Sequence, residues 1–307
     1  MRHSRTIDYG FTRLEKRLPW GAYGKEKDSY FWTAVGVGLA TLGGGLLGWM
    51  HRRRQVALEK RTIDLSAPIQ SLEVGSGFDV ELGFGLAEGL VMEGQPTILN
   101  EVNYTLHEGL LRVYLSPDGL PPESSRRVTL YLSLPSLSSI TLLSDSSLTA
   151  QGVNEVDHFT LVQHSSRLKG LQVEGEVASV RLSGEFKSVG HFRLKSLSVQ
   201  TVGNGKLKYD ALTSETNLSM AGSGLAYLSG LADRVDCSLS GRTKVHAEKF
   251  VAESVKVLLS HDAQAEWKVN QAYSVSLSER SHLILRGEEA KPSEVTVTQQ
   301  AKFIRCK

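Results

Sequence analysis

The stretch "SMAGSGLAYLSG", residues 219–230, places Gly222-Ser223-Gly224 directly after a short alternation of apolar and polar residues. Such glycines occur in phosphate-binding loops, in linkers and at the corners of repeated structures. A phosphate-binding loop needs a further glycine at a fixed spacing and a helix whose N-terminus faces the phosphate. Neither follows Gly224, so the pattern favours a corner.

The same local pattern recurs along the chain. A small or polar residue ends each successive alternation, at Asp145, His164, Gly184, Gly203, Gly222, Gly241, His261 and Glu279. The differences between successive residue numbers are 19, 20, 19, 19, 19, 20 and 18. Self-similarity at one short period predicts a solenoid, in which each repeat stacks on the next.

Each repeat contains a run with a period of two, such as "SVRLS" (179–183) or "VKVLLS" (255–260). This period is typical of a strand with one buried face. A repeat of this length is too short for a strand, a helix and two loops, but it can hold about three short strands. The sequence therefore predicts an all-β fold, a parallel β-helix with coils of about 19 residues.

The segment boundaries follow from the regularity of this pattern. We expect the β-helix domain over residues 63–304, with less regular capping coils at 63–137, regular repeats at 138–287 and a terminal strand at 288–304. An open end of a solenoid needs such a cap.

A membrane anchor is predicted before this domain. Residues 29–50, "SYFWTAVGVGLATLGGGLLGWM", carry no charge and have aromatic residues at both ends. As a helix they would span about 33 Å, enough for a hydrocarbon core of about 30 Å. We therefore expect a tail at 1–28, a transmembrane helix at 29–50 and a basic juxtamembrane linker at 51–62, in a single-pass protein of the membrane bilayer.

The predicted span contains Gly44 and Gly48, whose spacing allows close approach of a second helix. They are the candidate helix-packing residues. In the sequence that flanks the span, four basic residues precede it and five follow it, including Arg52, Arg53 and Arg54. By the positive-inside rule this slight excess favours a cytoplasmic location for the large domain.

The charge distribution argues against a nucleic-acid partner. Residues 1–65 carry 12 Lys and Arg against 6 Asp and Glu, or +6, whereas residues 66–307 carry 23 against 27, or −4. A nucleic-acid surface requires a basic domain. Lys206, Lys208, Lys244, Lys249 and Arg242 do cluster in the sequence. We interpret them as part of a mixed-charge face, because Glu215, Asp233 and Glu253 interleave them.

The sequence resembles the putative auto-transporter adhesin, head GIN domain family of bacterial β-solenoids over about residues 63–304. The segments "GSGFDVEL" (75–82), "EGQPTIL" (93–99), "EGLLRV" (108–113), "VTLYLSLPSLSSI" (128–140) and "LILRGEEAKPSEV" (283–295) carry the resemblance in their order. It implies a right-handed β-helix, commonly membrane-attached or exported, without an established catalytic site. The resemblance thus favours a periplasmic or exported domain, opposite to the charge pattern.

Four corner positions depart from the glycine usual in that family. If aligned residues of neighbouring coils lie side by side, Asp145 is next to His164, and His261 is next to Glu279. Such pairs occur in acid–base catalysis and in metal sites. No nucleophile or third ligand accompanies them, so we interpret them as solvated polar corners and expect no catalytic, cofactor or metal site. Cys237 and Cys306 are either free or joined by one bridge.

Two functions remain open. The first is a non-catalytic, membrane-anchored structural or interaction subunit that contacts other membrane-protein subunits through the Gly-rich helix and the solenoid flank. The alternative is an adhesin-like surface or periplasmic protein that binds polysaccharide or a partner protein.

Overall fold

The computed structural model describes residues 58–65, 67–85, 87–116 and 127–306. The predicted tail (1–28), the predicted membrane span (29–50) and most of the predicted linker (51–62) lie outside these ranges. Inside them, no helix has the length and the apolar character that crossing a membrane requires. Residues 59–62, expected in the linker, belong to the first strand.

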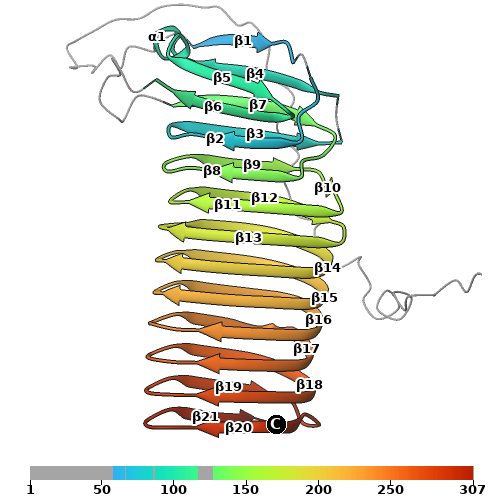
Figure 1. Cartoon of the computed structure of the whole chain (residues 1–307), viewed down its shortest axis with the longest axis vertical. Coiled ribbons are helices and arrows are strands. Elements are labelled where there is room, and N and C mark those ends of the chain that lie inside the picture. The colour runs from blue at the N-terminus through green and yellow to red at the C-terminus, as the bar shows by residue number, and fades with distance from the viewer. Residues whose placement is uncertain (1–57, 66, 86, 117–126, 307) are drawn as a thin grey trace, which may run out of the picture. The chain divides into compact units, whose positions relative to one another are not determined.

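The described residues form one hydrogen-bonded sheet that winds into stacked coils (Figure 1). The N-terminal part contains β1 (Glu59–Ile63), β2 (Ser71–Val74), β3 (Phe78–Phe84), β4 (Gly89–Gly94), α1 (Pro96–Leu99), β5 (Val102–His107), β6 (Leu110–Leu115) and β7 (Val128–Leu134). The coils that follow contain β8 (Ser139–Leu142), β9 (Ser147–Gln151), β10 (Asn154–Glu155), β11 (His158–His164), β12 (Arg167–Glu174), β13 (Val177–Gly184), β14 (Lys187–Gly203), β15 (Lys206–Gly222), β16 (Leu225–Leu239), β17 (Lys244–Leu259), β18 (Gln264–Leu277), β19 (His282–Arg286), β20 (Lys291–Val297) and β21 (Lys302–Cys306).

Each coil has two straight segments rather than the three short strands expected. Residues 187–193 of β14 pair with β12, and residues 196–203 of the same strand pair with β13, all in parallel. The two segments meet at a bend near Lys195, where the strand continues without a break. The predicted parallel β-helix, with one coil for each sequence repeat, is confirmed, and its right-handed sense stays a prediction.

The two segments of every coil build two walls. The front wall, which faces the viewer in Figure 1, contains β2, β6, β8, β11, β13, β20 and the second halves of β14–β18. The rear wall contains β3, β7, β9, β12, β19, β21 and the first halves of β14–β18. The walls join at a tight corner on one side and at the bend on the other.

Alternate side chains of both walls point inward and form the core. Aromatic rings of neighbouring coils touch edge to face there. The Phe192 and Tyr209 centroids are 4.9 Å apart, and those of Phe250 and Trp267 are 6.0 Å apart. Trp267 is fully buried. Burial of such side chains contributes about 1.5–3 kcal/mol each, and this repeated burial stabilises the stack.

The tight corners form a column of residues with left-handed backbone. Positive φ angles occur at Asp145, Ser165, Gly184, Gly203, Gly222, Gly241, His261, Glu279 and Gln299. The predicted corners are therefore confirmed at seven of the eight positions. At the remaining one the left-handed residue is Ser165, and His164 is instead the last residue of β11.

Both ends of the stack differ from the regular coils. The coil formed by β2 and β3 lies between the β6–β7 coil and the β8–β9 coil, although it comes first in the chain. The strands β1, β4 and β5 add antiparallel pairs beyond the β6–β7 coil, and Ile98 and Leu99 of α1 are buried. Residues 288–304 contain two strands, β20 and β21, so they add a coil where one terminal strand was expected.

Candidate functional site

The structure brings one of the two predicted corner pairs together. His261 Nε2 lies 3.9 Å from Glu279 Oε1, and both side chains are well exposed, at 62% and 44%. His261 Nδ1 is also 3.2 Å from the hydroxyl of Ser260. A solvent-exposed ion pair of this length contributes little energy, and the interpretation as a solvated corner remains our prediction.

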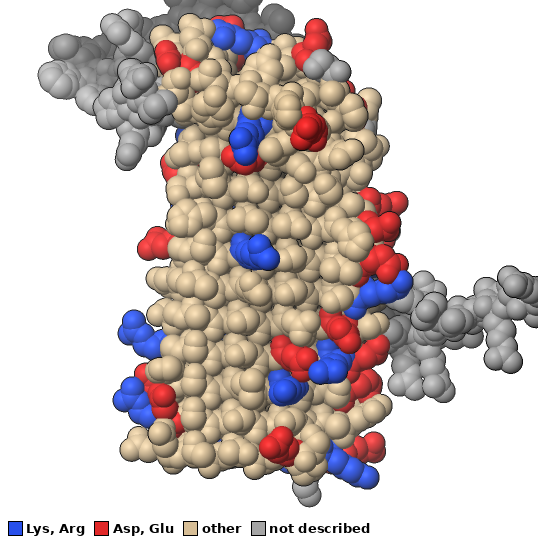
Figure 2. Space-filling view, in the orientation of Figure 1, with Lys and Arg blue, Asp and Glu red and all other residues tan. Residues whose placement is uncertain are grey.

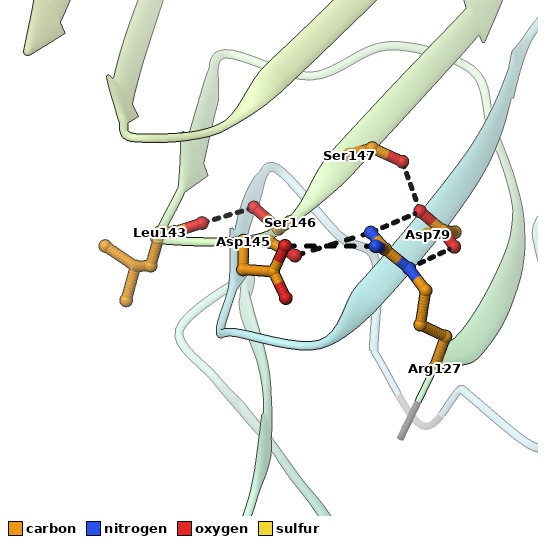
Figure 3. Close-up of polar contacts among 6 residues, drawn as sticks. All are labelled: Asp79, Arg127, Leu143, Asp145, Ser146 and Ser147. Atoms are coloured by element: carbon orange, nitrogen blue, oxygen red, sulfur yellow. Dashed lines mark hydrogen bonds and ion pairs between the residues drawn. The ribbon is translucent and has the colours of Figure 1, made fainter. Parts of the chain in front are cut away.

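The other predicted pair is separated because His164 is not at the corner. His164 Nδ1 lies 2.9 Å from the Ser183 hydroxyl. Asp145 instead faces Arg127, with 3.8 Å between Arg127 Nη1 and Asp145 Oδ1 (Figure 3). The same guanidinium donates two hydrogen bonds, of 2.6 and 2.8 Å, to Asp79. This arginine links β3, β7 and the corner at Asp145, which is a structural role.

One group of potential metal ligands was not predicted. Ligand atoms of His246, Glu248 and Glu266 lie within 4.8 Å of one another on the rear wall. The register of β17 and β18 places His246 directly beside Glu266. Arg286 already pairs with the Glu266 carboxylate, and His246 and Glu248 are exposed. This arrangement does not favour tight binding of an ion.

Uncharged polar side chains dominate the front wall. One outward column consists of Ser139, Thr160, Ser179, Ser198, Asn217, Asp236, Lys256 and Ser274. The next column consists of Thr141, Val162, Arg181, Gln200, Ser219, Ser238, Leu258 and Ser276. We call these two columns the hydroxyl wall. Figure 2 shows this face, on which charged side chains are sparse above its lower third.

A shallow hollow of about 280 Å³ lies on the hydroxyl wall. Its polar lining comes from both columns, with Ser198, Asn217, Asp236 and Lys256 on one side and Gln200, Ser219 and Ser238 on the other. Arg234 donates a 3.0 Å hydrogen bond to Asp236, whose other carboxylate oxygen is buried without a hydrogen-bond partner among the described residues. The hollow therefore offers hydroxyls and amides to a polar ligand.

The rear wall carries most of the basic cluster seen in the sequence, but without the acidic residues expected to interleave it. Two columns of outward-facing side chains lie next to the tight corner on this wall. Over five coils they contain Arg167, Lys169, Lys187, Val189, Lys206, Lys208, Leu225, Tyr227, Lys244 and His246. Six of these ten residues are Lys or Arg, and none is acidic. Glu215, Asp233 and Glu253 lie at the bend or just past it, along the edge where acidic side chains gather at the right of Figure 2. These three acidic residues therefore lie away from the two columns, whereas Asp210, Glu248 and Glu266 lie elsewhere on the rear wall.

The titratable groups with shifted pKa values have structural causes. Burial raises the pKa of the Tyr209 hydroxyl and of the Cys237 thiol. Burial, with a smaller contribution from Asp79, also raises the pKa of Glu81. Cys237 and Cys306 are both free, so no bridge joins them. Gly44 and Gly48, the predicted helix-packing residues, lie outside the described residues.

Two walls of stacked parallel strands, one polar and one basic, define this molecule as a β-solenoid with extended outward surfaces. The chain belongs to the putative auto-transporter adhesin, head GIN domain family, whose model matches residues 69–288. The resemblance found in the sequence is thus confirmed. No curated protein matches the chain.

The solved structures that match the chain include three that share its fold over most of their length. A putative adhesin from Parabacteroides distasonis is 11% identical with a TM-score of 0.63, and the match covers 82% of this chain and 98% of that one. A putative adhesin from Parabacteroides merdae is 14% identical with a TM-score of 0.59, covering 82% and 96%. A putative lipid binding protein from Parabacteroides distasonis is 14% identical with a TM-score of 0.59, covering 81% and 97%. At these identities the likeness concerns the fold alone.

Proposed function

We propose that this protein is a non-catalytic, adhesin-like β-solenoid that binds a polysaccharide through the hydroxyl wall. The observation that carries the proposal is the hollow formed by Ser198, Gln200, Asn217, Ser219 and Ser238 on a wall of repeated hydroxyl and amide groups. Sugar hydroxyls both donate and accept hydrogen bonds, and these side chains do the same. A stiff stack holds them in place before the ligand arrives, which limits the entropy lost on binding.

Residues 29–50 would hold the solenoid at a membrane. Their length, lack of charge and aromatic ends support this part of the proposal. We place the solenoid on the outer side, because membership of an adhesin family favours an exported domain. Protease added to intact cells should then remove the solenoid, and an undigested solenoid would contradict this placement.

The binding test uses the full-length chain in a mild detergent and an array of neutral and charged glycans. The variant Gln200→Ala/Asn217→Ala/Ser238→Ala removes polar groups from the hollow while keeping the strands. We expect its glycan affinity to fall by at least about tenfold, or about 1.4 kcal/mol. The control Lys208→Gln, on the rear wall, should bind neutral glycans as the wild type does. Equal binding by the triple variant, or release of new reducing ends from the glycan, would contradict the proposal.

A structural subunit of a membrane assembly is the second candidate. The pair Gly44 and Gly48 favours it, since this spacing suits close helix–helix packing. Purification of the full chain in a mild detergent should then recover a stoichiometric membrane partner, which Gly44→Leu/Gly48→Leu would lose. Recovery of the chain alone would count against this candidate.

A further inference from the structure

The six cations Arg167, Lys169, Lys187, Lys206, Lys208 and Lys244 form one surface, which we call the basic stripe. Arg167 is directly opposite Lys187 in the neighbouring strand, and Lys187 is directly opposite Lys206. Lys244 continues this column two coils further on, after Leu225. The stripe crosses four coil-to-coil steps, or about 19 Å at about 4.8 Å a step.

This arrangement is unfavourable for folding alone. Like charges directly opposite each other on neighbouring strands destabilise a sheet, and all six side chains of the stripe are exposed to solvent. Within the described ranges, none of the six forms an ion pair within 4 Å, although the charge of Lys169 partly offsets the rise that burial causes in the pKa of Glu81. The equivalent columns of the hydroxyl wall hold mainly Ser, Thr, Asn and Gln, so the fold does not require cations at these positions.

An aromatic surface lies within the stripe. The rings of Tyr227 and His246 are stacked, with centroids 5.2 Å apart and planes at 20°. Lys206 Nζ lies 4.8 Å from the centre of the Tyr227 ring. Tyr227 keeps 37% of its surface exposed. A flat ring between two groups of cations provides an apolar contact for a ligand whose remaining contacts are charged.

We propose that the basic stripe binds a linear acidic polysaccharide that lies across the coils. The cations repeated along the column form ion pairs with the carboxylates repeated along the polymer. The face of one sugar ring packs on the Tyr227 ring. Lysines provide compact point charges, which do not demand the two-pronged geometry of an arginine site. The stripe is on the opposite wall from the hollow, so this inference goes beyond the proposed function and can fail independently of it.

Two other polyanions fit the stripe less well. A single-stranded nucleic acid needs a series of stacking rings in a basic groove, and here one stacked pair lies in a part of the chain whose net charge is −4 for residues 66–307. A membrane surface is bound by cations accompanied by inserted apolar side chains, whereas Val189 and Leu225 of the stripe region are half-buried.

The test measures binding of the full-length chain, in a neutral detergent, to polygalacturonate at two salt concentrations. The stripe variant is Lys187→Gln/Lys206→Gln/Lys208→Gln. The control, Lys60→Gln/Arg112→Gln/Lys291→Gln, loses the same charge from strands that belong neither to the stripe nor to the hollow. We expect the stripe variant to bind at least about tenfold more weakly with a shallower salt dependence, and the control to stay within about twofold of the wild type. Circular dichroism should show both variants folded.

Three results would overturn the proposal. The first is no measurable binding of polygalacturonate at low salt, and the second is equal weakening by the stripe variant and the control. The third is tighter binding of oligo-dT or of phosphatidylglycerol vesicles than of polygalacturonate, because either would assign the stripe to another class of ligand.

Discussion

Gly203 and Gly222 are register partners in neighbouring coils, and their backbones approach so closely that Gly222 does not accept a side chain. A Cβ atom built on Gly222 would lie 2.5 Å from the carbonyl oxygen of Gly203. The same distance, 2.5 Å, separates a Cβ on Gly241 from the carbonyl oxygen of Gly222. This contact repeats from coil to coil, so it fixes how closely the corners stack.

The substitution Gly222→Ala should therefore destabilise the protein strongly. It adds the clash with Gly203 and places Ala at a φ of 104°, which L-residues rarely adopt. We expect the free energy of unfolding to fall by about 1–3 kcal/mol or more in urea denaturation. The matched control is Gly89→Ala, where φ is not positive and nothing lies within 4 Å of the added Cβ. A similar loss in both variants would contradict the corner assignment.

The two histidines first aligned as corners should respond to glycine in opposite ways. His261 has a φ of 60°, so His261→Gly relieves left-handed strain of about 1–2 kcal/mol and adds chain entropy of about 0.5–1 kcal/mol. We expect unchanged or slightly higher stability. His164 ends strand β11, so His164→Gly should lower stability by about 0.5–1 kcal/mol. Thermal unfolding of the two variants tests this, and the reverse order would mean that the alignment is wrong.

Removal of one cation from the basic stripe should stabilise the fold. Lys187 lies between Arg167 and Lys206, so Lys187→Gln removes two repulsions. We expect the free energy of unfolding to rise by about 0.2–1 kcal/mol at low salt. The gain should disappear near 1 M salt, where the Debye length is about 3 Å. Lys256→Gln, beside Asp236 on the front wall, is the control and should bring no gain. A salt-independent effect of Lys187→Gln would contradict the electrostatic explanation.

The two cysteines should differ in reactivity. Cys237 is buried with a raised pKa, so its thiol stays neutral and inaccessible in the native state. Cys306 is partly exposed. Labelling with a thiol reagent should modify one cysteine in the native chain and both after unfolding in urea. Rapid labelling of both cysteines without denaturant would contradict the burial of Cys237. Labelling of neither cysteine after unfolding without reductant would contradict the free state of the thiols.

The fold was largely predictable because it follows from two periods in the sequence. Alternation with a period of two identified the buried faces, and the longer period of the repeat identified the corners at Gly203, Gly222 and Gly241. The error at His164 arose in "HSS" (164–166), where each of three successive polar residues fits a corner. Hydrogen bonding decides among them, because Ser165 N donates to the carbonyl of Ser183 and Asp145 N donates to that of Ser165.

The surfaces were harder to predict, because a wall is assembled from residues far apart in the sequence. Glu215 follows Lys208 closely in the chain, but the bend between them places these residues on different walls. Arg167 and Lys206 are 39 positions apart, yet they flank Lys187 in one column. The basic stripe and the hydroxyl wall therefore become visible only when the coil register is known residue by residue.

The coil register is the claim on which both proposed surfaces depend, and one distance tests it directly. Ser179 and Glu294 belong to one outward column of the front wall, six coil-to-coil steps apart. Electron–electron distance spectroscopy on spin labels at these positions, in a chain with Cys237→Ala and Cys306→Ser, should give one narrow distribution centred at about 29 Å. A broad distribution, or a narrow one centred well away from that value, would contradict the stacked coils.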